Sequence, residues 1–131
     1  MLRSILFLME SEKMIKRILI VDDSPIVLKI LKKTLEGNNF EVCGMAQNGK
    51  EAVEFFEKLN PDLVFMDITM PELDGVEAAR IIFENRKDAN IIMLTAMGDD
   101  EILERAKQVG ITQFINKPFN DYKIISAIAK F

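Results

Sequence analysis

The sequence predicts an α/β domain in which five strands, each followed by a helix, build one doubly wound parallel sheet. Short apolar runs rich in β-branched residues alternate with longer segments whose apolar residues recur at helical spacing. The strand candidates are apolar on both faces, which is typical of parallel strands that helices cover on both sides. The 131 residues contain no internal repeat and no Gly/Ser-rich linker, so we expect a single (βα)5 unit.

The first strand is predicted over residues 17–21, where a β-branched-rich run ends at acidic residues. Ser24 and Pro25 then favour a helix start, because Ser accepts hydrogen bonds from first-turn amides and Pro needs no N–H at the first helical position. Gly37 is expected to end this helix in a left-handed conformation.

The second strand is predicted over residues 40–46. The pattern that begins at Asn48 resembles a capping box and opens a helix that stops before Pro61. The third strand follows over residues 63–67, and its last residue is acidic, Asp67.

The second half of the chain continues the alternation. Asp74 is predicted to cap a helix, and a fourth strand covers residues 91–95. A helix over about residues 99–110 leads to a fifth strand over residues 112–116. Asn120 then caps the last helix, which runs to the terminus.

Residues 1–14 are expected to form an extension outside the fold, so that the domain covers residues 15–131. The apolar stretch Ile5 to Met9 is shorter than the roughly 7–15 residues of a signal-peptide core. A membrane-spanning helix needs about 18 or more apolar residues, and the sequence has no such run. We therefore expect a cytoplasmic protein without membrane insertion.

The composition excludes several function classes. The 17 basic and 21 acidic residues give a net charge of −4, which argues against a strong electrostatic attraction to nucleic acid. The single cysteine, Cys43, cannot form an intrachain disulfide, which fits a reducing compartment. The chain has no His, so it carries no His-based metal site, no Ser-His triad and no phosphohistidine of its own.

Polar residues gather at the predicted carboxyl ends of the strands, where doubly wound sheets bind ligands. Three carboxylates that meet at one edge repel each other unless a cation neutralises them, and oxygen ligands without His or Cys select Mg²⁺ or a similar ion. A hydroxyl and a lysine around one carboxylate suit phosphoryl transfer, with the carboxylate as nucleophile. These strand-end residues are Asp22, Asp23, Asp67, Thr95 and Lys117.

Four motifs together resemble the signature of CheY-like receiver domains of two-component response regulators, and the resemblance covers residues 15–131. It implies a flavodoxin-like sheet with strand order 2-1-3-4-5. The motifs are Val21-Asp22-Asp23-Ser24, Met66 to Gly75, Leu94-Thr95-Ala96 and Lys117-Pro118-Phe119.

The resemblance also implies a metal site. Asp67 corresponds to the phosphoacceptor, which also contacts the Mg²⁺ ion. Asp22 and Asp23 correspond to the acidic pair that holds the ion, Asp23 directly and Asp22 often through water. The backbone carbonyl of Thr69 corresponds to the third protein ligand.

A switch is implied by three further positions. Thr95 matches the hydroxyl that follows the phosphoryl group, and Lys117 matches the lysine that pairs with that group. Phe114 matches the switch aromatic, although alone it would be read as a core residue. The bond between Lys117 and Pro118 corresponds to a peptide bond that is usually cis in the family.

The implied function is that of a stand-alone response regulator rather than an enzyme, since it catalyses only its own phosphorylation and dephosphorylation. A histidine kinase is the expected phosphodonor. The expected output is a partner protein that docks on the face formed by residues 99–110, 112–116 and 120–131, with the free protein monomeric. The segments around Thr69 and Thr95 favour a chemotaxis-like output over the alternative, a relay to a histidine phosphotransfer protein.

Two other classes share parts of the pattern. Phosphatases of the haloacid-dehalogenase type also form an aspartyl phosphate, but they need a second Asp where this chain has Thr69. Flavodoxin-like FMN binding needs a hydroxyl-rich loop after the first strand, where Asp22 and Asp23 would repel the phosphate.

Overall fold

The computed structural model describes residues 14–96, 98 and 100–131 of the chain. Its five strands form one parallel sheet in the order β2-β1-β3-β4-β5, as predicted. The proposed extension over residues 1–14 lies, except for Met14, outside the described residues and stays a prediction. The elements are β1 (Arg17–Val21), α2 (Pro25–Glu36), β2 (Glu41–Ala46), α3 (Gly49–Leu59), β3 (Leu63–Asp67), α4 (Gly75–Asn85), β4 (Ile91–Thr95), α5 (Asp100–Val109), β5 (Gln113–Asn116) and α6 (Asp121–Ile128).

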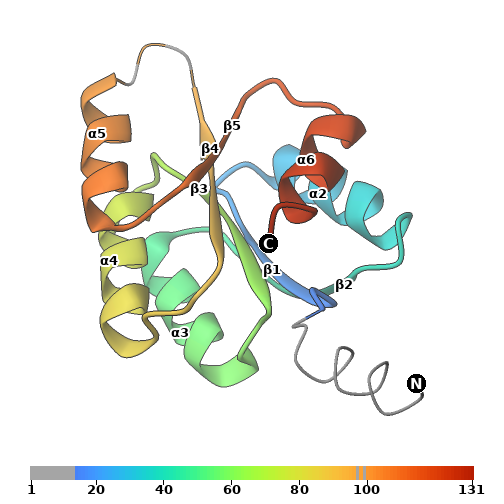
Figure 1. The fold of residues 1–131 in the computed structure, drawn as a ribbon, viewed down its shortest axis with the longest axis horizontal. Coiled ribbons are helices and arrows are strands. Elements are labelled where there is room, and N and C mark those ends of the chain that lie inside the picture. Colours follow the sequence, from blue (N-terminus) through green and yellow to red (C-terminus); the bar gives the residue numbers. More distant parts are fainter. Residues whose placement is uncertain (1–13, 97, 99) are drawn as a thin grey trace, which may run out of the picture.

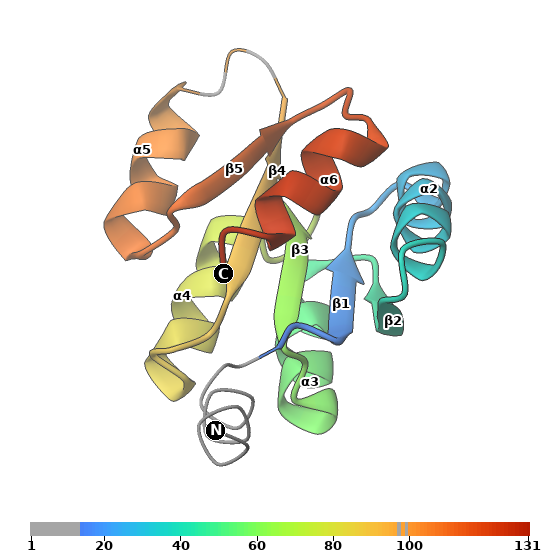
Figure 2. The same ribbon diagram turned by 45° about the vertical axis from the view of Figure 1, so that its right-hand side comes forward.

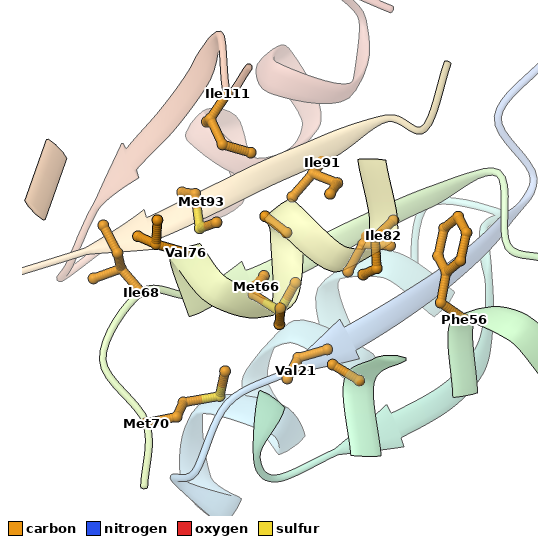
Figure 3. Packing of buried hydrophobic residues seen from close by; sticks show 14 of the residues in the cluster. Val21, Phe56, Met66, Ile68, Met70, Val76, Ile82, Ile91, Met93 and Ile111 are labelled. Atoms are coloured by element: carbon orange, nitrogen blue, oxygen red, sulfur yellow. The ribbon is translucent and has the colours of Figure 1, made fainter. Parts of the chain in front are cut away.

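Helices cover both faces of the sheet. Figures 1 and 2 show α3, α4 and α5 on one face and α2 and α6 on the other. Each face has its own apolar core, because the central strands β1, β3 and β4 present buried side chains in both directions. Figure 3 shows the core beneath α3, α4 and α5, which includes Val21, Phe56, Met66, Ile82 and Met93.

Four helices begin at the caps that the sequence predicts. In each case the side-chain oxygen of the capping residue accepts a hydrogen bond from the backbone N–H three residues later, which satisfies one of the free amides of the first turn. The caps are Ser24, Asn48, Asp74 and Asn120.

One predicted helix end is wrong. Gly37 has φ −69°, a right-handed conformation, and its N–H donates to the Lys33 carbonyl as if the helix continued. The left-handed residue is instead Asn39, with φ 68°. Asn tolerates this conformation better than other non-glycine residues, so the chain reverses two residues later than expected.

No helix in the described part of the chain is both long enough and apolar enough to cross a membrane.

Candidate functional site

The three predicted acidic residues meet at one edge of the sheet. Asp67 is the last residue of β3, while Asp22 and Asp23 follow β1, which pairs with β3 in parallel. One carboxylate oxygen from each lies within 4.8 Å of the others. Asp22 is fully buried and Asp67 is 6% exposed, whereas Asp23 is exposed. The edge therefore concentrates negative charge where water can reach it from one side.

Lys117 reaches this cluster from the end of β5, the outermost strand on one side of the sheet. Its ammonium lies 2.8 Å from Oδ2 of Asp22 and donates a hydrogen bond of 3.2 Å to Oδ1 of Asp67. The residue directly follows β5, and its backbone N–H donates to the Thr95 carbonyl at 2.7 Å. The peptide bond to Pro118 is cis. One positive charge thus stands against three carboxylates.

The carboxylate of Asp22 is held firmly on one side. Oδ1 accepts the backbone N–H of Ser24 at 2.9 Å, at the start of α2. Oδ2 is buried, and its ion pair with Lys117 lies outside hydrogen-bond alignment. This oxygen therefore retains capacity to coordinate a cation.

The environment of Asp67 raises its pKa to about 6. Burial is the main cause, because it disfavours the charged form, and the negative charge of Asp22 adds to it. Lys117 acts in the opposite direction and limits the rise. For Lys117 itself, burial lowers the pKa, but its contacts with Asp22 and Asp67 outweigh burial, and the pKa is raised overall.

These residues fit a divalent cation. The donors are carboxylate oxygens, one from each residue, at mutual distances that one ion can span. The buried Oδ2 of Asp22 also lacks an aligned hydrogen-bond donor. Hard oxygen donors without His or Cys favour Mg²⁺. Asp22, Asp23 and Asp67 are the side chains that would hold it.

Thr69 lies in the loop after β3 and is exposed. This loop is fastened at both ends, because Gly75 N–H donates to the Ile68 carbonyl and Gly49 N–H donates to the Leu73 carbonyl, each at 3.0 Å. The role of the Thr69 carbonyl as a ligand stays a prediction.

Thr95 is the last residue of β4 and is fully buried. Its hydroxyl donates to Oδ1 of Asn116 at 2.8 Å and lies 3.5 Å from the Ile115 carbonyl. The structure therefore pairs this hydroxyl with β5. Asn116 is not among the site residues predicted from the sequence. The sequence offers only a polar residue at the end of the fifth strand, and its pairing with Thr95 becomes visible in the register of β4 and β5.

Phe114 lies on β5 in register with Met93 and is half-buried. It packs against the core beneath α3, α4 and α5. Its position, two residues before Asn116, places it on the same face of β5 as the partner of Thr95.

Residues 18–129 match the family model of the response regulator receiver domain. The chain is similar to the chemotaxis protein CheY of Bacillus subtilis, with 45% identity over 89% of this chain and 98% of that protein. It is 42% identical to CheY of Thermotoga maritima, over 88% of this chain and 96% of that protein. Among solved structures, a CheX-CheY-BeF3-Mg²⁺ complex from Borrelia burgdorferi superimposes with a TM-score of 0.83 at 32% identity, covering 89% of each chain.

Proposed function

Because the chain belongs to the receiver domain family of response regulators, we propose that it accepts a phosphoryl group from a histidine kinase onto Asp67 in a Mg²⁺-dependent reaction. The observation that carries this proposal is the position of Asp67 between the acidic pair and Lys117, with the lysine ammonium 3.2 Å from its carboxylate. The relatives support a chemotaxis-like role in two-component signalling, and such proteins are signalling proteins rather than metabolic enzymes.

The proposed step is a displacement at phosphorus. A carboxylate oxygen of Asp67 forms a bond to the phosphorus of a phosphohistidine, the P–N bond breaks, and the leaving imidazole keeps the electron pair and takes a proton from solvent. Lys117 stays beside the carboxylate and offsets the charge on the transferred group. A bound Mg²⁺ would supply further positive charge at the phosphoryl oxygens.

We further propose that the product is read through Thr95 and Phe114. A phosphoryl group on Asp67 offers the Thr95 hydroxyl a charged acceptor, which is a stronger partner than a neutral amide. When the hydroxyl turns away from β5, it vacates space on the sheet face that α5 covers. The ring of Phe114 lies on this face and can move into that space. The surface of α5, β5 and α6 is therefore the proposed docking face.

The partner on this face is proposed to be another protein, with the free regulator a monomer in the cytoplasm. Support comes from the similar Borrelia burgdorferi structure, which is a complex of CheX with CheY, BeF3 and Mg²⁺. The acidic net charge of −4 favours a protein partner over nucleic acid.

The test of the phosphoacceptor is incubation with acetyl phosphate and Mg²⁺, followed by intact mass. The wild type should gain about 80 Da, the mass of one phosphoryl group. Asp67→Asn should not gain it, because an amide is a poor nucleophile. Asp100→Asn, which removes a carboxylate from α5, should label like the wild type. Labelling of Asp67→Asn, or labelling of the wild type in EDTA, would contradict the assignment or the metal requirement respectively.

A further inference from the structure

Asn116 and Thr95 face each other across the last two strands. They are register partners in the parallel β4–β5 pair, and the Thr95 hydroxyl donates to the Asn116 amide oxygen at 2.8 Å. Thr95 is fully buried, whereas Asn116 is exposed. A buried hydroxyl requires an acceptor, and the alternative in this position, the Ile115 carbonyl, is a weak one at 3.5 Å.

The hydroxyl of Thr95 has one proton and can donate it well to one acceptor at a time. A phosphoryl oxygen on Asp67 and the amide oxygen of Asn116 therefore compete for the same proton. We propose that Asn116 is a positioning residue that holds the Thr95 hydroxyl away from Asp67 and sets how readily the protein responds to phosphorylation. This inference rests on the proposed function.

The surrounding backbone allows the exchange to occur by side-chain rotation. The Thr95 carbonyl accepts the Lys117 N–H at 2.7 Å, so the end of β4 stays tied to β5 while the hydroxyl changes partner. Rotation about χ1 moves a threonine hydroxyl between staggered positions without moving the strand.

When the hydrogen bond between Thr95 and Asn116 breaks, the two residues differ in their access to water. Asn116 is exposed, so water can replace the lost hydrogen bond. Thr95 is buried and needs the phosphoryl oxygen as its new acceptor. The strength of the Thr95–Asn116 bond thus opposes the active arrangement directly, and Phe114 lies on the same face of β5 to follow the change.

The experiment measures the affinity for beryllofluoride, a phosphoryl mimic, in the presence of Mg²⁺ by NMR titration. Asn116→Val should lower the dissociation constant about fivefold, the equivalent of one net hydrogen bond. Gln113→Val removes an amide elsewhere on β5 and should leave the constant within about twofold of the wild type, as expected for a substitution outside the competing pair. In a Thr95→Val background, Asn116→Val should have no effect, because no hydroxyl remains to be held.

The results separate this inference from the proposed function. If the wild type binds no beryllofluoride and takes no label from acetyl phosphate, the proposed function fails. If the wild type binds beryllofluoride and Asn116→Val binds it equally well or more weakly, the proposed role of Asn116 is contradicted. If Asn116→Val still lowers the dissociation constant in the Thr95→Val background, the proposed role of Asn116 is also contradicted.

A second readout needs no variant at position 116. The χ1 coupling constants of Thr95 in the wild type should report one rotamer in the free protein and another after beryllofluoride is added. An unchanged rotamer would overturn the proposed exchange of partners.

Discussion

Asp67 stands in surroundings that oppose its own charge. Burial and the neighbouring Asp22 raise its pKa to about 6 from the ordinary value of 3.8, so the folded protein binds a proton more tightly than the unfolded chain does. Between these two values the unfolded state is ionised while the folded state keeps its proton. Stability must therefore fall as the pH rises through this window.

Because the charged form of Asp67 destabilises the folded state, its removal should stabilise the protein. In EDTA at pH 7, the free energy of unfolding of Asp67→Asn should exceed that of the wild type by about 1–2 kcal/mol. This is less than the full pKa shift implies, because solvent reaches the site. At pH 4 the difference should shrink to about 0.5 kcal/mol, because the folded wild-type carboxyl is then protonated and the unfolded one is nearly half protonated. Urea unfolding at both pH values measures it. An equal difference at both pH values would mean that the effect has another origin than ionisation.

Lys117 is the counter-charge for a fully buried carboxylate, Asp22, and for Asp67. Lys117→Met should lower the free energy of unfolding by about 2–4 kcal/mol in EDTA, because it leaves these charges without their ammonium partner. Saturating Mg²⁺ should restore part of the loss, since the ion binds only the folded site. Lys123→Met, an exposed lysine on α6, is the control and should change little. Equal stability of Lys117→Met and wild type in EDTA would contradict the electrostatic role.

At this scale, the sequence predicted the acidic cluster and the lysine because each directly follows a recognisable apolar strand. Neither the direct ion pair between Lys117 and Asp22 nor the bond from Thr95 to Asn116 could be predicted in the same way. Both depend on side-chain rotamers and on the register of β4 and β5, which the apolar pattern does not specify.

At the scale of elements, α2 and α6 are joined on their side of the sheet by one polar contact. The hydroxyl of Thr34, a buried residue on α2, donates to Oδ1 of Asp121 at the start of α6 at 2.7 Å. The helix α6 spans only eight residues, from Asp121 to Ile128, and is too short to be stable alone. Its position thus depends on packing and on this bond.

We expect Thr34→Val to lower the free energy of unfolding by about 1 kcal/mol, because the bond is lost while water can still reach the exposed Asp121 carboxylate. Asp121→Ala should cost a similar amount, and the double variant should cost less than the sum of the two. Chemical denaturation of the four proteins measures the coupling, with Thr112→Val as an exposed control. Strict additivity would show that the two helices do not depend on this contact.

Element order and capping were predictable because both depend on local chemistry, as the caps at Asn48 and Asp74 show. The failure at Gly37 is of a different kind. Glycine permits a left-handed turn but does not impose one, and the position of β2 in the sheet decides where the chain turns, which here is at Asn39.

For the molecule as a whole, the proposed switch connects the strand-end site to a distant surface. Addition of beryllofluoride and Mg²⁺ should shift NMR resonances of Asp22 and Asp67, and also those of Phe114 and α5. The reason is that Phe114 lies two residues before Asn116, the register partner of Thr95, and packs against the core that α5 covers. An amide-shift map measures this, with Asp62 at the opposite end of β3 as the internal reference. Shifts confined to the loops around the acidic cluster would contradict the route.

The parallel order of the sheet also determines when the site comes into existence. Its parts lie at the ends of β1, β3, β4 and β5, and the lysine that closes it directly follows β5, the last of these strands to be synthesised. Parallel strand pairs form only between distant segments, which makes their assembly one of the slower events of folding. A nascent or partly folded chain that lacks β5 therefore has no Lys117 beside Asp67 and no partner for Thr95. If Asp67 is the phosphoacceptor, as proposed, we expect acceptance of a phosphoryl group only in chains that have completed their sheet.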